Sequence, residues 1–553
     1  MIEIKTEILV IGGGLAGMMA ALAASRAGLS VALATKSILL SASGNTSRAG
    51  GGFAVSTGYT EAGDSPQSHY EDTLKSGAYM NDRNMVRVLC EKAPIYLKCL
   101  ADSGVPFMVE NGRFKNFRLP GHSYPRAVRL LGGGTRKMAE VLGRQLVQNG
   151  VRIETGVFLK DLVIDRRHVA GAAGLYVKNG LPVVFKAKAV ILASGGGGSI
   201  FPLTTNKKDS TGDGMAMTLR AGFTLKDLEF IQFTPTAMAF PPNLAGQSIG
   251  GILLGQPEAR LYNGAGKRFM EDYDPVRMEA ATRDVVARSI YREILQGRGT
   301  VHGGVYLDVT GVPGEVLKST GNVLEFLRKK GIDLSVHQIE IAPAAHFFMG
   351  GIKVDPFCYT GTGGLFAAGE VTAGVHGANR LSGNGLTEAM VFGMVAGENA
   401  ARYVREAETA LPSDNVYQDY IRPLTEIKIR GGTGAVQQRE LHLKLQMIAV
   451  RSLGVERTQS GLKEGLREIN NLEGSLTGVN TDNHRHQIKL YELENMVLVT
   501  RALIKAALTR TESRGAHYRI DYPQRDDTGW LKNVCIKMCD KKLKTWLEPV
   551  TGI

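Results

Sequence analysis

Two side chains suited to binding an anion stand in glycine-rich sequence past the middle of the chain. His346 precedes Gly350-Gly351, and Arg380 lies in the run His376-Gly377-Ala378-Asn379-Arg380-Leu381-Ser382-Gly383-Asn384-Gly385. Glycine lets the backbone approach a ligand closely, while histidine and arginine donate hydrogen bonds to negative charge. The sequence therefore predicts a pocket for a small anion, built on loops that carry His346 and Arg380.

The N-terminus has the pattern of a dinucleotide-binding unit. An apolar strand is expected over residues 3–11, followed by Gly12-Gly13-Gly14-Leu15-Ala16-Gly17, a helix over 18–27 and a second strand over 30–34. A strand, a glycine turn and a helix in this order place a pyrophosphate at the helix N-terminus, where free N–H groups and the helix dipole favour negative charge.

The second strand ends in Thr35-Lys36, without the acidic residue that binds the ribose of NAD. The polar, glycine-rich segment 41–53 follows it and can form a backbone cradle around a flavin and its ribityl chain; the alternative is a long surface loop. Another apolar strand, 188–198, ends in glycines and is expected to return the chain to the cofactor domain.

Size and composition narrow the class of protein. The chain has 553 residues, 43% of them hydrophobic and 22% charged, which predicts a globular protein of roughly three or four structural units. The net charge is +13, and the basic residues do not alternate with aromatic residues, so we expect no nucleic-acid partner. Two explanations of the positive charge stay open: a solvated basic surface, and docking to an acidic partner. No stretch reaches the roughly 20 apolar residues of a membrane span, and the first residues leave no room for a signal peptide, so a cytoplasmic protein is expected.

The five cysteines form no CxxC pair, although Cys535 and Cys539 have the spacing of one helical turn. We expect reduced thiols and no metal site.

At this point the chain resembles the flavoprotein subunit of the succinate dehydrogenase and fumarate reductase family, whose sibling is L-aspartate oxidase. The resemblance covers nearly the whole chain, and its motifs are Gly12–Gly17, Thr35-Lys36, Asp64-Ser65 with His69 and Asp72-Thr73, Thr211–Gly214, Arg283–Arg288, His346–Gly351, His376–Leu386, and Glu512–His517 with Asp521-Tyr522-Pro523.

The resemblance implies an α/β fold: a Rossmann-like FAD-binding domain interrupted by an α+β capping domain and followed by a helical C-terminal region. We expect the FAD domain at residues 1–232 and 343–405, the cap at 233–342, and the helical domain with a basic tail at 406–553.

The resemblance also assigns FAD contacts. They fall on Gly12, Gly14, Ala16, Gly17, Thr35, Lys36, Ser43, Gly44, Asn45, Thr46, Gly51, Gly52, Asp213, Glu370, Gly385 and Leu386. Glu370 is expected to bind a ribose hydroxyl. Asn45 matches the histidine that is bonded covalently to the flavin in the membrane respiratory enzymes, and asparagine cannot form that bond. The FAD is therefore expected to be non-covalent.

The implied chemistry is hydride transfer between flavin N5 and one carbon of an activated C=C bond, with proton transfer at the neighbouring carbon. Arg380 and His346 match the residues that bind a substrate carboxylate, and Arg283 matches the arginine that moves the proton. Without the resemblance, Arg283 could equally cap or pair on the helix expected over 284–296.

Two segments depart from the family pattern. A Phe-His-Pro-Thr stretch reads Phe233-Thr234-Pro235-Thr236 here, and segment 251–260 lacks a Thr-Glu pair. In the family these groups hold the second carboxylate of a C4 dicarboxylate. We therefore expect Thr234 in the substrate site, and an acid with a less polar far end becomes a candidate substrate.

Three functions stay open. The first is a fumarate reductase/succinate dehydrogenase-type catalytic subunit that exchanges electrons with an iron–sulfur partner and meets the membrane only through partner subunits. The second is an L-aspartate oxidase-like enzyme. The third is an electron-transfer flavoprotein subunit with a modified substrate site.

Overall fold

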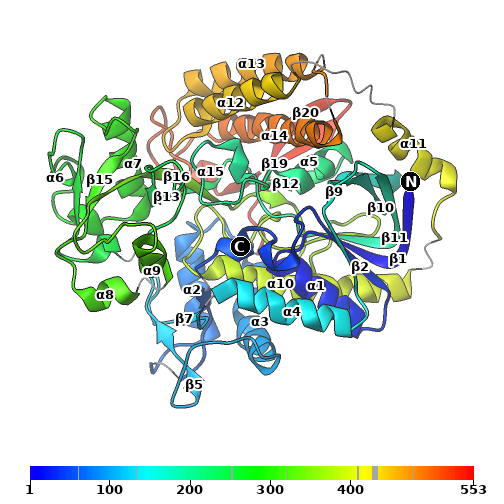
Figure 1. Cartoon of the computed structure of the whole chain (residues 1–553), viewed down its shortest axis with the longest axis horizontal. Helices are drawn as coiled ribbons and strands as arrows, with labels where there is room; N and C mark the ends of the chain where they lie inside the picture. Colours follow the sequence, from blue (N-terminus) through cyan, green and yellow to red (C-terminus); the bar gives the residue numbers. More distant parts are fainter. Residues whose placement is uncertain are drawn as a thin grey trace.

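The computed structural model describes residues 1–50, 52–59, 61–132, 134–250, 253–319, 322–407, 410–425, 434–477, 479–481 and 483–552. Figure 1 shows three regions around the centre of the molecule: a strand-rich region near the N-terminus, a separate lobe of helices and strands on the left, and the C-terminal helices at the top. The predicted α/β class with a helical C-terminal region is confirmed.

A seven-stranded sheet forms the region nearest the N-terminus. Its parallel strands are β8 (Arg152–Thr155), β2 (Val31–Thr35), β1 (Ile2–Ile11), β11 (Pro182–Leu192) and β18 (Leu365–Ala367); β10 (His168–Tyr176) and β9 (Val157–Asp165) extend it antiparallel. Ile8, Leu9 and Val10 are fully buried, as expected of a strand covered on both faces. The strands predicted at the N-terminus and before the second glycine run are therefore present.

Glycines allow two long helices to pack closely over this sheet. Helix α1 (Leu15–Arg26) lies against α10 (Asn384–Glu406), and a Cβ atom at Gly397 would lie 2.3 Å from the carbonyl oxygen of Ala20. Only glycine permits that distance. The close packing holds α10, which begins in the predicted cofactor segment, against α1.

The separate lobe has its own sheet and its own hydrophobic core. The sheet runs β13 (Ile231–Met238), β16 (Ile339–Phe348), β15 (Val305–Asp308) and β14 (Arg260–Tyr262), with helices α6 (Met270–Tyr273), α7 (Arg283–Leu295), α8 (Gly314–Ser319) and α9 (Asn322–Arg328). Its core extends from Met238 to Ile341 and is distinct from the core around the large sheet. The division of the chain into domains stays a prediction.

The long helices of the described C-terminal region end at residue 509, and a short helix and two strands follow. The helices are α11 (Asp414–Thr425), α12 (Gly434–Leu453), α13 (Gln459–Leu476) and α14 (His484–Thr509). The basic tail is a hairpin of β19 (Lys532–Cys539) and β20 (Lys542–Pro549), and Cys535 and Cys539 both lie in β19. The alternating apolar residues Val534 and Ile536 fit a strand.

The hairpin joins two strands that flank the separate lobe. The order of this sheet is β17 (Gly351–Ile352), β12 (Thr224–Lys226), β19 and β20. Asp227, directly after β12, has a backbone φ of +59°, and its carboxylate accepts hydrogen bonds from Asn533 and from the backbone N–H of Val534. The C-terminal hairpin is thus fixed to the connection that enters the lobe, and β17 of the returning connection pairs with the other side of β12.

The remaining elements surround these three regions. They are β3 (Gly52–Ala54), α2 (Pro66–Ser76), α3 (Arg83–Asp102), β4 (Val109–Glu110), β5 (Arg113–Phe114), β6 (Asn116–Phe117), β7 (Ala127–Arg129), α4 (Gly134–Gln148), α5 (Asp213–Arg220) and α15 (Asp527–Trp530).

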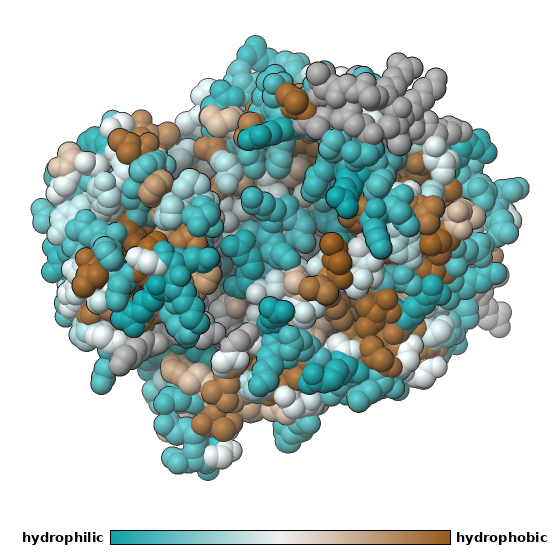
Figure 2. Space-filling view, in the orientation of Figure 1, coloured by the Kyte–Doolittle hydropathy of each residue, from teal (hydrophilic) through white to brown (hydrophobic). Residues whose placement is uncertain are grey.

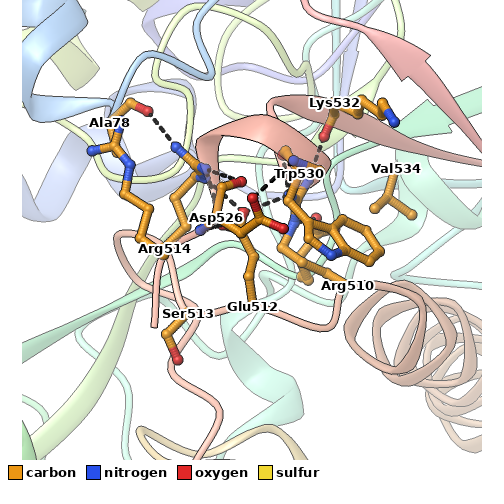
Figure 3. Close-up of polar contacts among 12 residues, drawn as sticks. Ala78, Arg510, Glu512, Ser513, Arg514, Asp526, Trp530, Lys532 and Val534 are labelled. Carbon is orange, nitrogen blue, oxygen red and sulfur yellow. Dashed lines mark hydrogen bonds and ion pairs between the residues drawn. The ribbon is translucent and has the colours of Figure 1, made fainter. Parts of the chain in front are cut away.

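A buried group of arginines and glutamates fixes the segment that follows α14. Glu512 accepts hydrogen bonds from both Arg510 (3.0 Å) and Arg514 (2.6 Å), and Arg514 also donates to the carbonyl oxygen of Ala78 (Figure 3). Arg510 pairs with Glu229 at 2.6 Å. Because buried charges are costly unless they are paired, this group sets the course of residues 510–518.

The surface in Figure 2 is largely hydrophilic, with hydrophobic residues in separate groups. Among the described helices, none has the length and apolar character needed to cross a membrane.

Candidate active site

A cleft of about 320 Å³ lies where the separate lobe meets the rest of the molecule. The lobe contributes the beginning of α7, from Thr282 to Arg288. Other lining residues come from the beginning of β13, from loop 379–382 and from the C-terminal residues Gly515, Ala516 and Tyr518. The residues that line the cleft therefore come from distant parts of the sequence.

Two arginines in this cleft have no carboxylate partner among the described residues. Arg380 is 9% exposed and donates through Nη2 to Oε1 of Gln232 at 3.0 Å, while its Nε has no partner in the described part of the chain. Arg283 donates through Nη2 to Oγ of Ser382 at 3.3 Å. The cleft thus holds two positive charges available to an anion.

Burial and mutual repulsion both act on these arginines. Burial, followed by the charge of Arg283, lowers the pKa of Arg380 to about 10. Burial also lowers the pKa of Arg283. Both stay protonated at neutral pH, and a bound carboxylate would relieve their repulsion.

Gln232 was not found from the sequence, yet it holds Arg380 in place. Its Oε1 accepts from Arg380, while its Nε2 donates to the Arg380 carbonyl oxygen (3.0 Å) and to Oδ1 of Asn379 (2.8 Å). Gln232 is 5% exposed in an apolar strand. A buried amide needs hydrogen-bond partners. A glutamine in an otherwise apolar strand was therefore the feature of the sequence that could have pointed to Gln232.

His346 lies in strand β16, so the prediction of a loop at this position is wrong. Pairing of β16 with β13, with Phe347 opposite Gln232, extends the strand to Phe348. The imidazole contacts Oγ1 of Thr205 through Nδ1 at 2.7 Å. Burial, then the charges of Arg380 and Arg283, lowers the pKa of His346 to about 3, so it is a neutral hydrogen-bonding group. The adjacent Phe347 ring lies under Arg380, 4.6 Å from its guanidinium carbon.

Thr234 is buried in β13 and is not among the described residues that line the cleft; Gln232 and Phe233 line it instead. An irregularity in the register between Gln232 and Phe233 brings both to the cleft, and the next side chain then lies on the other face. In segment 251–260, which lacks the Thr-Glu pair of the family, Gly251 and Ile252 lie outside the described residues, and residues 253–260 do not line the cleft. The role of Thr234 stays a prediction.

The glycine turn after β1 brings backbone segments close together at the beginning of α1. A Cβ atom at Gly12, where φ is +121°, would lie 2.2 Å from the Ala193 carbonyl oxygen, and one at Gly17 would lie 1.8 Å from the Gly12 carbonyl oxygen. Helix α1 has no side-chain cap at Gly14, although the Leu15 N–H donates to Thr46. These residues fit a pyrophosphate at the helix N-terminus.

Asn45 and Glu370, far apart in sequence, meet through a hydrogen bond. Nδ2 of Asn45 donates to Oε2 of Glu370 at 3.2 Å, and Oδ1 of Asn45 accepts from the Lys207 N–H at 2.9 Å. Oε1 of Glu370 accepts from the Phe348 N–H. Burial raises the pKa of Glu370 to about 7, so this carboxyl group is poised to share a proton or a hydrogen bond with a ligand hydroxyl.

Lys36 is the centre of a second group of predicted cofactor residues. Its Nζ lies 2.8 Å from Asp213 and 2.6 Å from Glu492 of α14. Burial works to lower the pKa of Lys36, but the charges of Asp213 and Glu492 outweigh it and raise that pKa. Glu492 was not predicted, because nothing near it in the sequence indicates this contact.

The other predicted cofactor residues are spread over several elements. Thr35 and Ser43 share a hydroxyl–hydroxyl hydrogen bond of 2.9 Å. Gly51 lies outside the described residues. The rest are Ala16 in α1, Gly44 with φ of +57°, Gly52 in β3, and Gly385 and Leu386 in the first turn of α10.

The sequence matches two family models. Residues 7–386 match a model described as FAD binding domain, and residues 442–552 match one described as fumarate reductase flavoprotein C-term. Together with the glycine turn and the cleft, these matches define a flavin-dependent oxidoreductase that acts on CH–CH bonds.

Several relatives are similar over almost their whole length. A fumarate reductase (CoM/CoB) subunit from Methanothermobacter marburgensis is 36% identical over 94% of this chain and 95% of its own. An L-aspartate oxidase of Streptomyces coelicolor is 33% identical over 97% and 92%. The solved structure of Mycobacterium smegmatis Sdh1 in complex with UQ1 covers 100% of this chain and 95% of its own, with 32% identity and a TM-score of 0.90. The chain belongs to the flavoprotein-subunit family of succinate dehydrogenases and fumarate reductases, as its motifs predicted.

The contact between Gln232 and Arg380 gives a prediction. In Gln232→Glu, a carboxylate replaces the amide beside Arg380 and competes with a ligand anion, so the Kd for a small carboxylate such as malonate rises by roughly 10- to 100-fold. Calorimetric titration of each variant with malonate measures this Kd. Gln232→Met removes the hydrogen bonds without adding charge and is expected to have a smaller effect; equal effects would contradict the assignment of Arg380 as the anion-binding group.

Proposed function

We propose that this chain is the catalytic subunit of an FAD-dependent enzyme that interconverts a C=C and a CH–CH bond of a carboxylic acid. The single observation that carries the proposal is the pair of cleft arginines, Arg283 and Arg380, which have no carboxylate partner within the described ranges. Two adjacent residues of β16 support the proposal, because they connect the cleft to the predicted cofactor site. The Phe347 ring packs under Arg380, and the N–H of Phe348 donates to Glu370, a predicted cofactor residue.

The three catalytic residues divide into a carboxylate-binding pair and a proton-transfer group. Arg380, with neutral His346, binds the substrate carboxylate and stabilises the charge that develops when the double bond is reduced. Arg283 moves the proton to or from the neighbouring carbon. Its burial lowers its pKa and so makes proton donation easier than from a solvated guanidinium. Bound FAD supplies the hydride acceptor and donor.

We propose that the FAD is held non-covalently by the predicted cofactor residues. The amide of Asn45 is already engaged with Glu370, Lys207 and Ser210, and an amide nitrogen is not a nucleophile toward flavin. Gly12, Gly14, Ala16 and Gly17 serve the pyrophosphate, and Glu370 serves a ribose hydroxyl.

Acid precipitation of the purified protein is therefore expected to release all of its FAD. The absorbance of the supernatant at the flavin band measures the release. Flavin that stays with the denatured polypeptide would contradict the non-covalent assignment.

We propose that residues 233–342 act as a cap that closes over the substrate. This lobe has its own core and contributes Arg283 to the cleft, so its position decides whether the proton donor reaches the substrate. Closure would exclude water and strengthen the electrostatic interactions inside.

An L-aspartate oxidase activity fits the cleft less well. Among the described residues that line it, the only carboxylate belongs to Asp284, which is paired with Arg288 at 2.9 Å. The ammonium group of an amino acid would meet four cationic side chains of that lining, Lys75, Arg283, Arg288 and Arg380. The retained cleft also disfavours an electron-transfer subunit without a substrate.

We propose that the electrons are exchanged with an iron–sulfur partner subunit, and that any association with a membrane passes through partners. The relative from Methanothermobacter marburgensis is named as one subunit of a fumarate reductase, which supports an assembly of several chains.

The proposal is tested with reduced, FAD-loaded protein and a panel of acids that includes fumarate, crotonate and aspartate-derived iminosuccinate. Unsaturated acids are expected to reoxidise the flavin. No reoxidation by any unsaturated acid, together with hydrogen peroxide release from aspartate in air, would overturn the proposal in favour of the oxidase.

Arg283→Ala is expected to lower turnover by a factor of at least about 10³, because the variant lacks the proton-transfer group, while FAD stays bound. Flavin absorbance and reoxidation kinetics measure the two properties separately. Near wild-type turnover in this variant would contradict the mechanism.

A further inference from the structure

We propose that Ser382 is a positioning residue for Arg283, and that the buried group centred on Arg126 fixes Ser382 in turn. The inference rests on the proposed function, in which Arg283 moves the proton. It concerns residues to which the sequence analysis assigned no role: Ser382, Asp64 and Asp72, which lie in family motifs, and His122, which does not.

The hydroxyl of Ser382 is the group that orients the Arg283 guanidinium. Nη2 of Arg283 donates to Oγ of Ser382 at 3.3 Å, and both side chains line the cleft. Within the described part of the chain, Arg283 makes no other side-chain hydrogen bond or ion pair. An arginine side chain loses several rotatable bonds when it is fixed, so one contact at its tip decides where its charge lies.

The backbone of Ser382 is itself held by a histidine from the other side. Nε2 of His122 contacts the Ser382 carbonyl oxygen at 2.7 Å, and Nδ1 faces Nη1 of Arg126 at 3.5 Å. Since a carbonyl only accepts and a guanidinium only donates, the arrangement requires a neutral imidazole with its proton on Nε2. Burial, and to a lesser degree the charge of Arg126, lowers the pKa of His122 and keeps the ring neutral.

Arg126 gives this histidine a rigid support. It is 0% exposed, its Nε donates to Asp64 at 2.7 Å, its Nη1 donates to Asp72, and its Nη2 donates to Ser68 at 2.7 Å. Asp72 also accepts from the N–H and the hydroxyl of Ser123, the residue after His122. Two carboxylates and one guanidinium, all buried, form a unit that moves only at high cost.

These contacts form one line from the protein interior to the cleft. Arg126 orients His122, His122 fixes the Ser382 carbonyl, and the Ser382 hydroxyl orients Arg283. Ser382 lies outside the separate lobe, whereas Arg283 is the first residue of the lobe's helix α7. The hydrogen bond between them therefore forms only when the lobe places α7 against loop 379–382, which couples lobe position to the orientation of the proton donor.

The test is kinetic. Ser382→Ala is expected to lower kcat about tenfold, the loss typical of one hydrogen bond to a charged group, with KM and FAD content changed less than twofold. Ser382→Thr keeps the hydroxyl and is expected to recover most of the activity. Ser289→Ala is the matched control, because Ser289 lies on α7 and its hydroxyl donates to the Val285 carbonyl oxygen of the same helix. Wild-type kcat in Ser382→Ala would overturn the inference.

A double-mutant cycle separates a role through Arg283 from a general structural role. In an Arg283→Lys background, measured by single-turnover flavin reoxidation, Ser382→Ala is expected to cause no further loss. A further tenfold loss would show that Ser382 acts independently of Arg283 and would overturn the inference. His122→Gln retains a donor to the Ser382 carbonyl oxygen and should keep more activity than His122→Ala; equal losses would overturn the role of His122.

The proposed function and this inference fail in different ways. If Arg283→Ala is active, the proposed function is wrong. If Arg283→Ala is inactive while Ser382→Ala matches wild type, only the positioning role is wrong.

Discussion

Two positive charges share one cleft, the buried Arg380 and the partly buried Arg283, and their repulsion bears on every group that contacts them. Arg283 and Arg380 repel each other, and burial makes the repulsion stronger. Their partners within the described residues are neutral: an amide from Gln232, a hydroxyl from Ser382 and the ring face of Phe347. Neutral groups orient a guanidinium without cancelling its charge, so both charges stay available to an anion.

The contrast with the C-terminal segment shows that this is selective. Arg510 and Arg514 are also buried, yet both share Glu512 and are internally neutralised. Those arginines are neutralised within the chain, whereas the contacts of the cleft arginines among the described residues are with neutral groups. The same residue type thus keeps or loses its net charge locally, according to whether a carboxylate lies beside it.

The sequence was sufficient to predict structure and candidate site residues where these depend on a local pattern of residues. The strand, glycine turn and helix at residues 3–27 determine their own geometry, and the family motifs pointed to both Arg283 and Arg380. It was insufficient where partners are distant. Gln232, Ser382 and Glu492 act through residues that are 99 to 456 positions away, and no local spacing encodes such contacts. The strand at His346 was missed because its pairing partner, β13, lies more than a hundred residues earlier.

The short sheet that receives the C-terminal hairpin has a mechanical consequence. The chain enters the separate lobe just after β12 and leaves it just before β17, and β12 pairs with both β17 and β19. The two crossings touch, since a Cβ atom at Gly350 would lie 2.1 Å from the Asp227 carbonyl oxygen. A lobe that is attached through two adjacent strands at one place can rotate about that place more easily than it can translate. The C-terminal hairpin therefore braces the one small sheet through which the chain both enters and leaves the separate lobe.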